Sequence, residues 1–322
     1  MSFSHSDKDS LNEIAGEQTG KQGVESGTIW ADTIQKLSII VPAYNEERGI
    51  KGVLDRLDAV LRGLELSYEI VVVDDGSADA TVTEAQKCKV RLIRHEQNRG
   101  YGASLKTGIR HATGDTVLIM DADGSYPPEA IPVLLREAEG QDMVVGARGF
   151  VGGQDFFRRM AKWILKRLAG YLVETKIPDL NSGMRLFKRA VVMSYFHLLP
   201  SNFSFTTTIT LALLSDGYAV RYVPIHYAKR IGRSKIRPVR DLTNFLMLIF
   251  RTIVYFNPLK VFLPISLGLC AAGIGVMSWR LAVYRDIAQS EVLMVLLGTQ
   301  IGIMGLLADL VVRRLNWLGK NE

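Results

Sequence analysis

Short apolar runs alternate with segments of helical periodicity through the first half of the chain. Five runs have the length and composition of buried strands, and they lie at residues 37–41, 69–73, 90–94, 116–120 and 143–147. The segments of helical periodicity lie at about 47–64, 80–87, 102–112 and 128–139. Strands that are apolar at every position are buried on both faces, as in a parallel sheet. The pattern therefore predicts an α/β domain with a mostly parallel sheet.

The next part of the chain is less regular. A basic helical stretch at 156–173 precedes the loop PDLNSG at 178–183, and the strand-like MRLFKR follows directly. A helix at about 205–216 then leads to the strand-like AVRYVPI and to the basic loop AKRIGRSK, which ends at Lys235. We expect these elements to form a lobe beside the sheet.

The last part of the chain is dominated by apolar residues. They recur at helical spacing from Pro238 to Phe256, which predicts a helix at a membrane interface, with a buried core helix as the alternative. Two longer apolar segments follow at 259–279 and 292–312, and each can span a hydrocarbon core about 30 Å thick. The remaining sequence offers too little apolar surface to bury two such helices in a globule. We therefore expect a transmembrane hairpin.

Basic residues flank the outer ends of this hairpin. Lys260 opens the first span, Arg313, Arg314 and Lys320 follow the second, and the connecting segment 280–291 has nearly balanced charge. Lys and Arg favour the cytoplasmic side of a membrane. The sequence thus predicts an integral membrane protein with both termini and the α/β domain on the cytoplasmic side.

The formal net charge of +6 does not indicate nucleic-acid binding, because acidic residues are nearly as numerous as basic ones and no basic run alternates with aromatic residues. Basic residues gather just before the apolar tail, where they favour anionic lipid headgroups. The first 35 residues are polar and lack an apolar signal segment, so we expect a flexible tail. Cys88 lies in the soluble part and Cys270 in a span, and a disulfide between them is not expected.

Polar motifs follow the expected strands at the points where each strand ends. In chain order they are PAYNEE, DDGS, HEQNRG, DADGSYPPE and GARGF. Open parallel sheets bind ligands beyond the carboxyl ends of their strands, so these loops would converge on one edge. The G-x-G-x-x-G fingerprint is absent after the first strand, which disfavours a nicotinamide or flavin enzyme.

Two pairs of carboxylates stand at strand ends. Asp121 and Asp123 are one residue apart after the fourth apolar run, a spacing suited to Mg²⁺ or Mn²⁺ bound to phosphates, with an Asx turn as the alternative. Asp74 and Asp75 follow the second run, where they can accept hydrogen bonds from a ribose or a base, with a turn cap as the alternative. The ordered combination of these motifs favours a nucleotide site.

The segments VPAYNEE, VVVDDGS, NRGYGASLKTG, DADGSYPPE and VVGARGF together resemble the nucleotide-sugar domain of the family 2 glycosyltransferases. The branch that the chain resembles most is dolichol-phosphate mannose synthase and its bacterial polyprenyl-phosphate sugar transferase relatives. The resemblance implies a Rossmann-like fold of the GT-A type, a nucleotide-sugar donor used with Mg²⁺ or Mn²⁺, and a polyprenyl phosphate acceptor. The expected organisation is a polar tail at 1–35, a cytosolic GT-A domain at 36–236, an interfacial helix at 237–257 and a transmembrane hairpin at 258–322.

The resemblance also assigns roles to residues. Contacts with the nucleotide sugar are implied for Pro42, Ala43, Tyr44, Glu46, Asp74, Asp75, Asp121, Ala122 and Asp123. Metal binding is implied for Asp121 and Asp123, with Asp123 as the more direct ligand. Catalytic roles are implied for Asp123, Arg148, Arg230 and Lys235. Acceptor contacts are implied for Arg148, Arg159, Ser182, Ser234 and Lys235.

Two positions depart from the family pattern. Ser125 stands where many relatives have Gln, so its part in metal binding is open. The arginine of the acceptor lobe is hard to register, and Arg158, Arg159 and Lys162 are all candidates. For the basic loop that ends at Lys235, attraction to lipid headgroups is the alternative role.

The reaction that the resemblance implies is one inverting displacement. A polyprenyl phosphate is already anionic, so its oxygen can attack the anomeric carbon of a hexose without a strong protein base. The donor can be GDP-mannose or UDP-glucose, and the acceptor can be dolichyl or undecaprenyl phosphate. Homo-oligomerisation through the membrane region stays open. A hydroxyl-bearing membrane lipid is the alternative acceptor, with Asp179 as the nearest candidate base. A noncatalytic membrane scaffold is the alternative from another class.

Overall fold

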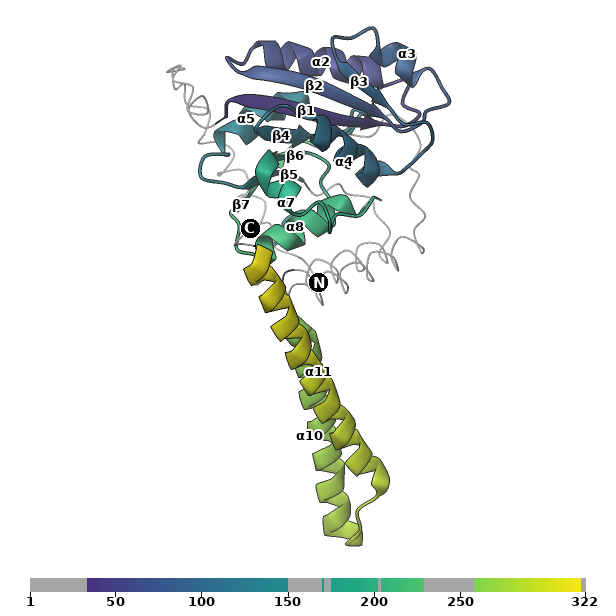
Figure 1. Cartoon of the computed structure of the whole chain (residues 1–322), viewed down its shortest axis with the longest axis vertical. Coiled ribbons are helices and arrows are strands. Elements are labelled where there is room, and N and C mark those ends of the chain that lie inside the picture. The colour runs from purple at the N-terminus through teal and green to yellow at the C-terminus, as the bar shows by residue number, and fades with distance from the viewer. Residues whose placement is uncertain (1–33, 150–169, 171–174, 202–203, 229–257, 320–322) are drawn as a thin grey trace, which may run out of the picture.

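The computed structural model describes residues 34–149, 170, 175–201, 204–228 and 258–319. Two parts are visible in Figure 1: an α/β domain and, extending away from it, a pair of long helices. Most of the predicted tail and all of the predicted interfacial helix at 237–257 lie outside the described residues. Those two assignments therefore stay predictions.

The α/β domain is built on a mixed sheet of seven strands in the order β3-β2-β1-β4-β6-β5-β7. The strands are β1 (Lys36–Ala43), β2 (Ser67–Asp74), β3 (Arg91–Arg94), β4 (Thr116–Ile119), β5 (Met143–Arg148), β6 (Arg185–Lys188) and β7 (Val220–Ile225). Among these strands, β6 runs antiparallel to both of its neighbours and the other pairs are parallel. The predicted fold class, a mostly parallel α/β domain, is confirmed.

Helices cover both faces of the sheet (Figure 1). They are α2 (Ile50–Arg62), α3 (Thr81–Ala85), α4 (Tyr101–His111), η1 (Pro128–Ala130), α5 (Ile131–Arg136), α7 (Arg189–Ser194) and α8 (Phe205–Ser215). Alternate residues of the central strands enter two separate cores, because successive side chains of a strand point to opposite faces. Ile39 packs with Leu54 and Leu57 of α2, whereas Ile40 packs with Leu105 and Ile109 of α4.

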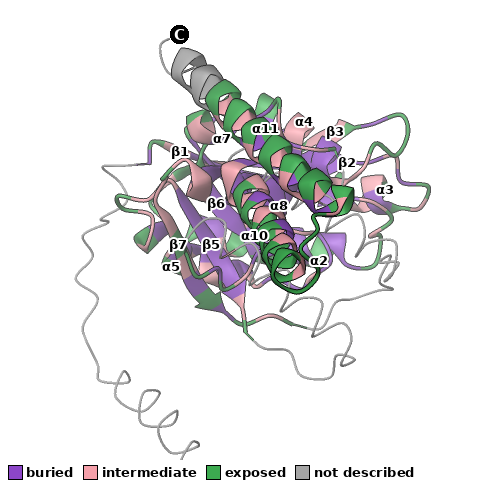
Figure 2. Cartoon of the chain, turned by 90° about the horizontal axis from the view of Figure 1, so that it is seen from below, coloured by how far each residue is buried: buried purple, intermediate pink, exposed green. Residues whose placement is uncertain are grey.

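The long helices are α10 (Pro258–Tyr284) and α11 (Gln289–Gly319). Residues 258–284 and 289–312 are long and apolar enough to cross a membrane. Figure 2 shows these helices mostly exposed while the strands of the α/β domain are mostly buried. Leucines on them are strongly exposed, such as Leu293 and Leu310, each 63%. The predicted spans are thus present as two apolar helices, and the side of the membrane stays a prediction.

Small residues let the two long helices approach each other closely. A Cβ added at Gly298 of α11 would lie 2.7 Å from the sulfur of Cys270 and 3.0 Å from the carbonyl oxygen of Ser266 on α10. A Cβ at Gly273 of α10 would lie 2.8 Å from the side chain of Val295. Helices associate in membranes through such close contacts of small residues. Cys88 and Cys270 are both free, as expected.

Candidate active site

The predicted motifs lie at one edge of the sheet because β1, β2, β4 and β5 run in the same direction. β4 and β5 are separated by β6 alone, so these two strands run about 10 Å apart, two strand spacings. The intervening strand is reversed, and the loop that leads into it therefore enters the sheet at this same edge. A ligand placed here meets loops from strands on both sides of β6.

The loop after β1 is tied to the loop after β2. Pro42 and Ala43 are the last residues of β1, and the Ala43 carbonyl accepts a hydrogen bond from the Asp75 amide at 2.8 Å. The Glu46 amide donates to the Thr81 hydroxyl at 2.8 Å. Asn45, between Tyr44 and Glu46, adopts a left-handed backbone with φ 53° and donates its amide to a serine hydroxyl of the DDGS loop at 2.9 Å. These contacts fix the backbone beside which a nucleotide is expected.

Asp75 is held by the segment that precedes α4. His95 Nδ1 lies 2.8 Å from Asp75 Oδ1, and the Arg99 and Gly100 amides donate to its two oxygens at 2.9 Å each. Asp75 is 4% exposed. Asp74 is fully buried and accepts hydrogen bonds from the amide at the turn of its own loop, so the turn-cap alternative describes this residue. Asp75 is thus held by the segment that follows β3, whereas Asp74 is held by its own loop.

Asp121 and Asp123 follow β4 on the short turn that the sequence predicts. The Tyr101 hydroxyl donates to Asp121 Oδ1 at 2.8 Å. Burial and the neighbouring Asp121 carboxylate raise the pKa of Tyr101 well above its usual range, so this hydroxyl keeps its proton. Asp123 Oδ1 accepts hydrogen bonds from both the amide and the hydroxyl of Ser125, at 3.0 Å and 2.5 Å. Ser125 thus orients Asp123 through an Asx turn.

Two carboxylates at one strand end fit a divalent cation that is shared with a diphosphate. Magnesium is usually held by one or two protein carboxylates together with phosphate oxygens and water. Within the described part of the chain, no group of three or more His, Cys, Asp or Glu residues is placed to hold a metal without such a ligand. The donor set of Asp121 and Asp123 therefore suits a metal brought by a nucleoside diphosphate. Ala122, between them, turns its side chain into the core.

Arg148, the last residue of β5, forms a two-pronged ion pair with Asp179. Its Nε lies 2.7 Å from Asp179 Oδ2 and its Nη2 lies 2.9 Å from Oδ1, while its backbone amide donates to Oδ2 at 3.1 Å. Burial opposes ionisation of Asp179, but the hydrogen bonds and charge of Arg148 outweigh it and lower the pKa of the carboxyl. Burial likewise opposes the charge of Arg148, and the same partner outweighs it and raises the pKa of the guanidinium. The Arg148 guanidinium also lies over the Tyr227 ring, 5.4 Å from its centroid.

The loop from Asp179 to Gly183 enters the sheet between the ends of β4 and β5. The Gly183 amide donates to the Tyr126 hydroxyl at 2.6 Å. A Cβ added at Gly183 would lie 2.5 Å from Asp121 Oδ2, so only glycine allows the loop to pass this close to the carboxylate. Ser182 is fully buried and donates its hydroxyl to the Gly146 carbonyl at 2.5 Å. The predicted acceptor contact of Ser182 finds no support in this geometry, because its hydroxyl faces a backbone group inside the sheet.

Several predicted site residues lie outside the described residues. They are Arg159, Arg230, Ser234 and Lys235, together with the alternatives Arg158 and Lys162. Their roles stay predictions. The described edge brings together the residues predicted after β1, β2, β4 and β5, and it adds His95, Tyr101 and Gly183, which the sequence did not single out. Tyr101 lies in the motif NRGYG and His95 opens the motif HEQNRG, and their position after β3 was the available signal.

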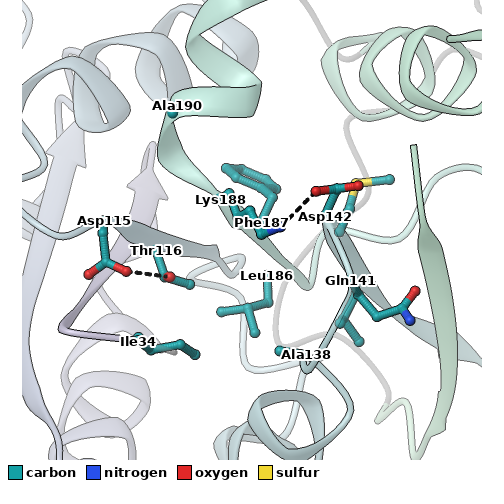
Figure 3. A pocket seen from close by; sticks show the side chains of 12 residues that line it. Ile34, Asp115, Thr116, Ala138, Gln141, Asp142, Leu186, Phe187, Lys188 and Ala190 are labelled. Atoms are coloured by element: carbon teal, nitrogen blue, oxygen red, sulfur yellow. Dashed lines mark hydrogen bonds and ion pairs between the residues drawn. The ribbon is translucent and has the colours of Figure 1, made fainter. Parts of the chain in front are cut away.

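The cavity in Figure 3 lies away from this edge. It has a volume of about 260 Å³ and is lined at the amino ends of β4 and β5 by residues that include Thr116, Met143 and Phe187. The salt bridge between Lys188 and Asp142, 2.8 Å long, crosses its rim. Of the residues predicted to carry the chemistry, none that the structure describes lines it. Ligands of open parallel sheets bind at the other edge, and we assign the cavity no part in the chemistry.

Comparisons with known proteins agree with the fold. Residues 38–196 match the model of glycosyl transferase family 2, and residues 257–313 match the GtrB C-terminal hairpin. A dolichol-phosphate mannosyltransferase from Pyrococcus furiosus is 33% identical over 231 residues, which are 67% of this chain and 63% of that protein. A dodecaprenyl-phosphate galacturonate synthase from Rhizobium johnstonii is 26% identical over 298 residues, which are 86% of this chain and 88% of that protein.

Solved structures match the α/β domain. Glucosyl-3-phosphoglycerate synthase from Mycobacterium tuberculosis, in complex with Mn²⁺, UDP-glucose and phosphoglyceric acid, has a TM-score of 0.57 at 21% identity and covers 74% of this chain and 85% of its own. At this identity the likeness shows the fold alone. It is the fold that the resemblance implied.

Proposed function

We propose, from the glycosyltransferase family 2 domain and the GtrB C-terminal hairpin that this chain carries, that it transfers a hexose from a nucleotide sugar to a polyprenyl phosphate. One observation carries the proposal. The carboxylates of Asp121 and Asp123 and the guanidinium of Arg148 stand at the same sheet edge, on the two sides of β6, in a chain with two helices apolar enough to cross a membrane. That arrangement suits two anionic substrates, one of them a lipid.

The state of Asp179 favours a phosphate acceptor over a hydroxyl acceptor. A hydroxyl must lose its proton to a base, and the best base has a pKa near the working pH. The pKa of Asp179 is instead lowered, and both of its oxygens accept hydrogen bonds from Arg148. A carboxylate in this state is a weak base. A phosphate oxygen is already ionised and needs none.

The proposed mechanism is a single displacement at the anomeric carbon. A phosphate oxygen of the acceptor forms the new bond while the bond between the sugar and the nucleoside diphosphate breaks, and the electron pair leaves with the diphosphate. Asp121 and Asp123 would hold the Mg²⁺ or Mn²⁺ ion, which supplies positive charge to the departing diphosphate. Asp75 and the loop of Tyr44 and Glu46 orient the nucleotide.

Arg148 has the second task in this proposal. Two anionic substrates repel each other, and a guanidinium presents a rigid set of donors that matches phosphate oxygens. Arg148 is 29% exposed and held in one orientation by Asp179, so part of its surface remains open to a ligand. We assign Arg148 to the acceptor phosphate. Arg230 and Lys235, which lie outside the described residues, are proposed to bind the phosphates of the donor and the acceptor.

The donor sugar is left to experiment. The two relatives are named for mannose and for galacturonate, and dolichol and dodecaprenyl phosphate name their acceptors. GDP-mannose and UDP-glucose remain the donors to test first, with dolichyl and undecaprenyl chains as acceptors. We further propose that the catalytic domain and both termini face the cytoplasm, and that homo-oligomers would form through the hairpin.

The test is transfer of radiolabelled sugar by purified protein in detergent, with GDP- and UDP-sugars, Mn²⁺ and a short-chain polyprenyl phosphate. Asp123→Ala should abolish lipid-linked product, whereas Asp55→Ala should not, because Asp55 lies on α2 with its side chain 54% exposed and paired to Lys51. A diacylglycerol acceptor is run in parallel. Product on the glycerolipid and none on the phosphate would refute the proposal and support the hydroxyl alternative.

A further inference from the structure

Arg185, the first residue of β6, is an arginine whose relative exposure is 0%. Its Nε donates to the Ser182 carbonyl and its Nη2 donates to the Leu180 carbonyl, both at 2.8 Å. Its Nη1 donates to the Thr210 hydroxyl on α8. Nη1 also lies 3.9 Å from the Met143 sulfur, so the hydrogen-bond partners of this guanidinium in the described residues are neutral groups, and two of the four belong to one loop.

Burying a guanidinium makes the free energy of folding less favourable, because the charge loses its hydration. Arg does not lose its charge in proteins, and burial without an opposite charge is unfavourable unless hydrogen bonds compensate. Burial lowers the pKa of Arg185, as expected for a cation removed from water. An apolar residue of similar volume would avoid this cost. The hydrogen bonds to the loop are what the guanidinium supplies and such a residue would not.

The loop held by Arg185 touches both halves of the candidate active site. At its first end Asp179 fixes the side chain of Arg148. At its other end Gly183 passes directly over the carboxylate of Asp121. The loop thus contacts the carboxylate after β4 and the arginine after β5 at the same time.

We propose that Arg185 is a positioning residue, which fixes the loop 179–183 and so sets the distance between the metal-diphosphate carboxylates and the acceptor-binding Arg148. The kinetic part of this inference rests on the proposed transfer reaction, and the structural part does not. Both carbonyls that Arg185 holds lie inside the loop, so its removal leaves the interior of the loop held by the Ser182 hydroxyl on the Gly146 carbonyl and by the Thr207 hydroxyl on Asn181. A displacement of about 1 Å in a positioning element can lower a rate by about 100-fold.

The chain offers a matched control in Arg189. This arginine also donates to two backbone carbonyls, those of Ile109 at 3.1 Å and Arg110 at 3.2 Å. It lies at the start of α7, beyond the carboxyl end of β6, and hence at the opposite edge of the sheet. Arg189→Met removes the same kind of interaction without touching the loop.

The first measurement is hydrogen–deuterium exchange of the full-length protein in detergent. In Arg185→Met the amides of Asn181 and Gly183, which are hydrogen-bonded in the loop, should exchange at least about tenfold faster while those of β1 and β2 are unchanged. Arg185→Lys keeps the charge but cannot reach both carbonyls in one plane, and an intermediate rate is expected. Arg189→Met should leave the loop amides at the wild-type rate.

The second measurement is transfer to short-chain polyprenyl phosphate by the same samples. Arg185→Met should lower kcat by about 100-fold and Arg185→Lys by about tenfold, with the Kd for a nucleoside diphosphate and Mn²⁺ within about threefold of wild type. Arg189→Met should retain kcat. If Arg185→Met failed to fold, both kcat and nucleotide binding would be lost together. The same comparison of kcat with Kd is then made on Arg185→Lys.

Two results would overturn the inference: loop exchange at the wild-type rate in a folded Arg185 variant, or a kcat within about threefold of wild type when exchange has increased. A wild-type protein that transfers no sugar to polyprenyl phosphate would instead refute the proposed function. In that case the exchange measurement alone decides whether Arg185 positions the loop.

Discussion

The ion pair between Arg148 and Asp179 permits a decisive test of how the acceptor is activated. Asp179→Asn keeps the size of the side chain but replaces one oxygen by an NH₂ group, which cannot accept from the guanidinium. One of the two side-chain bonds, 2.7 Å and 2.9 Å long, is then lost. A hydrogen bond to a charged group contributes about 1.5–3 kcal/mol, and its loss corresponds to a decrease of about 10- to 150-fold in kcat/KM.

That range overlaps the loss expected if Asp179 were a general base, which is about 10²–10⁴-fold. A double-mutant cycle separates the two cases. If Asp179 acts by orienting Arg148, then Asp179→Asn should cost less than about threefold once Arg148→Gln is present. If it acts as a base, the full loss should persist in that background. Additive losses in kcat/KM for the lipid phosphate would therefore refute our reasoning.

The pH profile gives a second reading of the same variants. Because the pKa of Asp179 is lowered, this carboxylate stays ionised throughout the pH range in which a phosphate monoester titrates. A phosphate monoester takes up a proton near about pH 6, so the rate should fall below that pH through the acceptor. We expect the rate of Asp179→Asn to decrease over the same pH range as that of the wild type. Disappearance of this decrease would assign the proton uptake to Asp179 and support the hydroxyl alternative.

Three further outcomes follow from buried contacts. His95→Ala should raise the KM for the nucleotide sugar by about 5- to 30-fold and leave the acceptor KM unchanged, since it removes a 2.8 Å contact to the buried carboxylate after β2. Gly183→Ala should weaken Mn²⁺-dependent nucleotide binding measured by calorimetry, because its Cβ would lie 2.5 Å from a carboxylate oxygen of Asp121. Gly52→Ala on α2 is the control: its Cβ would meet nothing within 4 Å, and the substitution should stabilise the protein by about 0.5–1 kcal/mol. Gly298→Ala should lower the thermal unfolding temperature in detergent, and Gly268→Ala, which faces open space, should not.

The first five strands could be predicted from the sequence because each is a short apolar run with a polar motif at its end. β1, β2 and β4 are buried on both faces, so their composition alone identified them. The edge at which the motifs meet followed from the parallel direction of the strands. The apolar helices α10 and α11 were equally visible, since their composition differs from that of the rest of the chain.

The contacts that orient the site could not be read in the same way. Asp179 was weighed as a base from its position in the sequence, while its pairing with Arg148 depends on a contact between residues 31 positions apart. Ser182 lies in the loop next to Arg148 and Asp121, but its hydroxyl donates a hydrogen bond to the Gly146 carbonyl. The direction of a side chain within a loop depends on the strands around it, and sequence spacing does not record those neighbours.

The reversed strand explains why a mostly parallel sheet can bring these groups together. A parallel strand would present its carboxyl end at the active edge and continue away from it. β6 instead begins at that edge, so the loop 179–183 arrives between Asp121 and Arg148 and is drawn inward by Arg185. The half of the edge formed by β1, β2 and β4 is thereby joined to the half formed by β5 through one short segment. For this reason we expect variants in the interior of this loop, at residues 180–182, to lower kcat more than they weaken the affinity for either substrate alone.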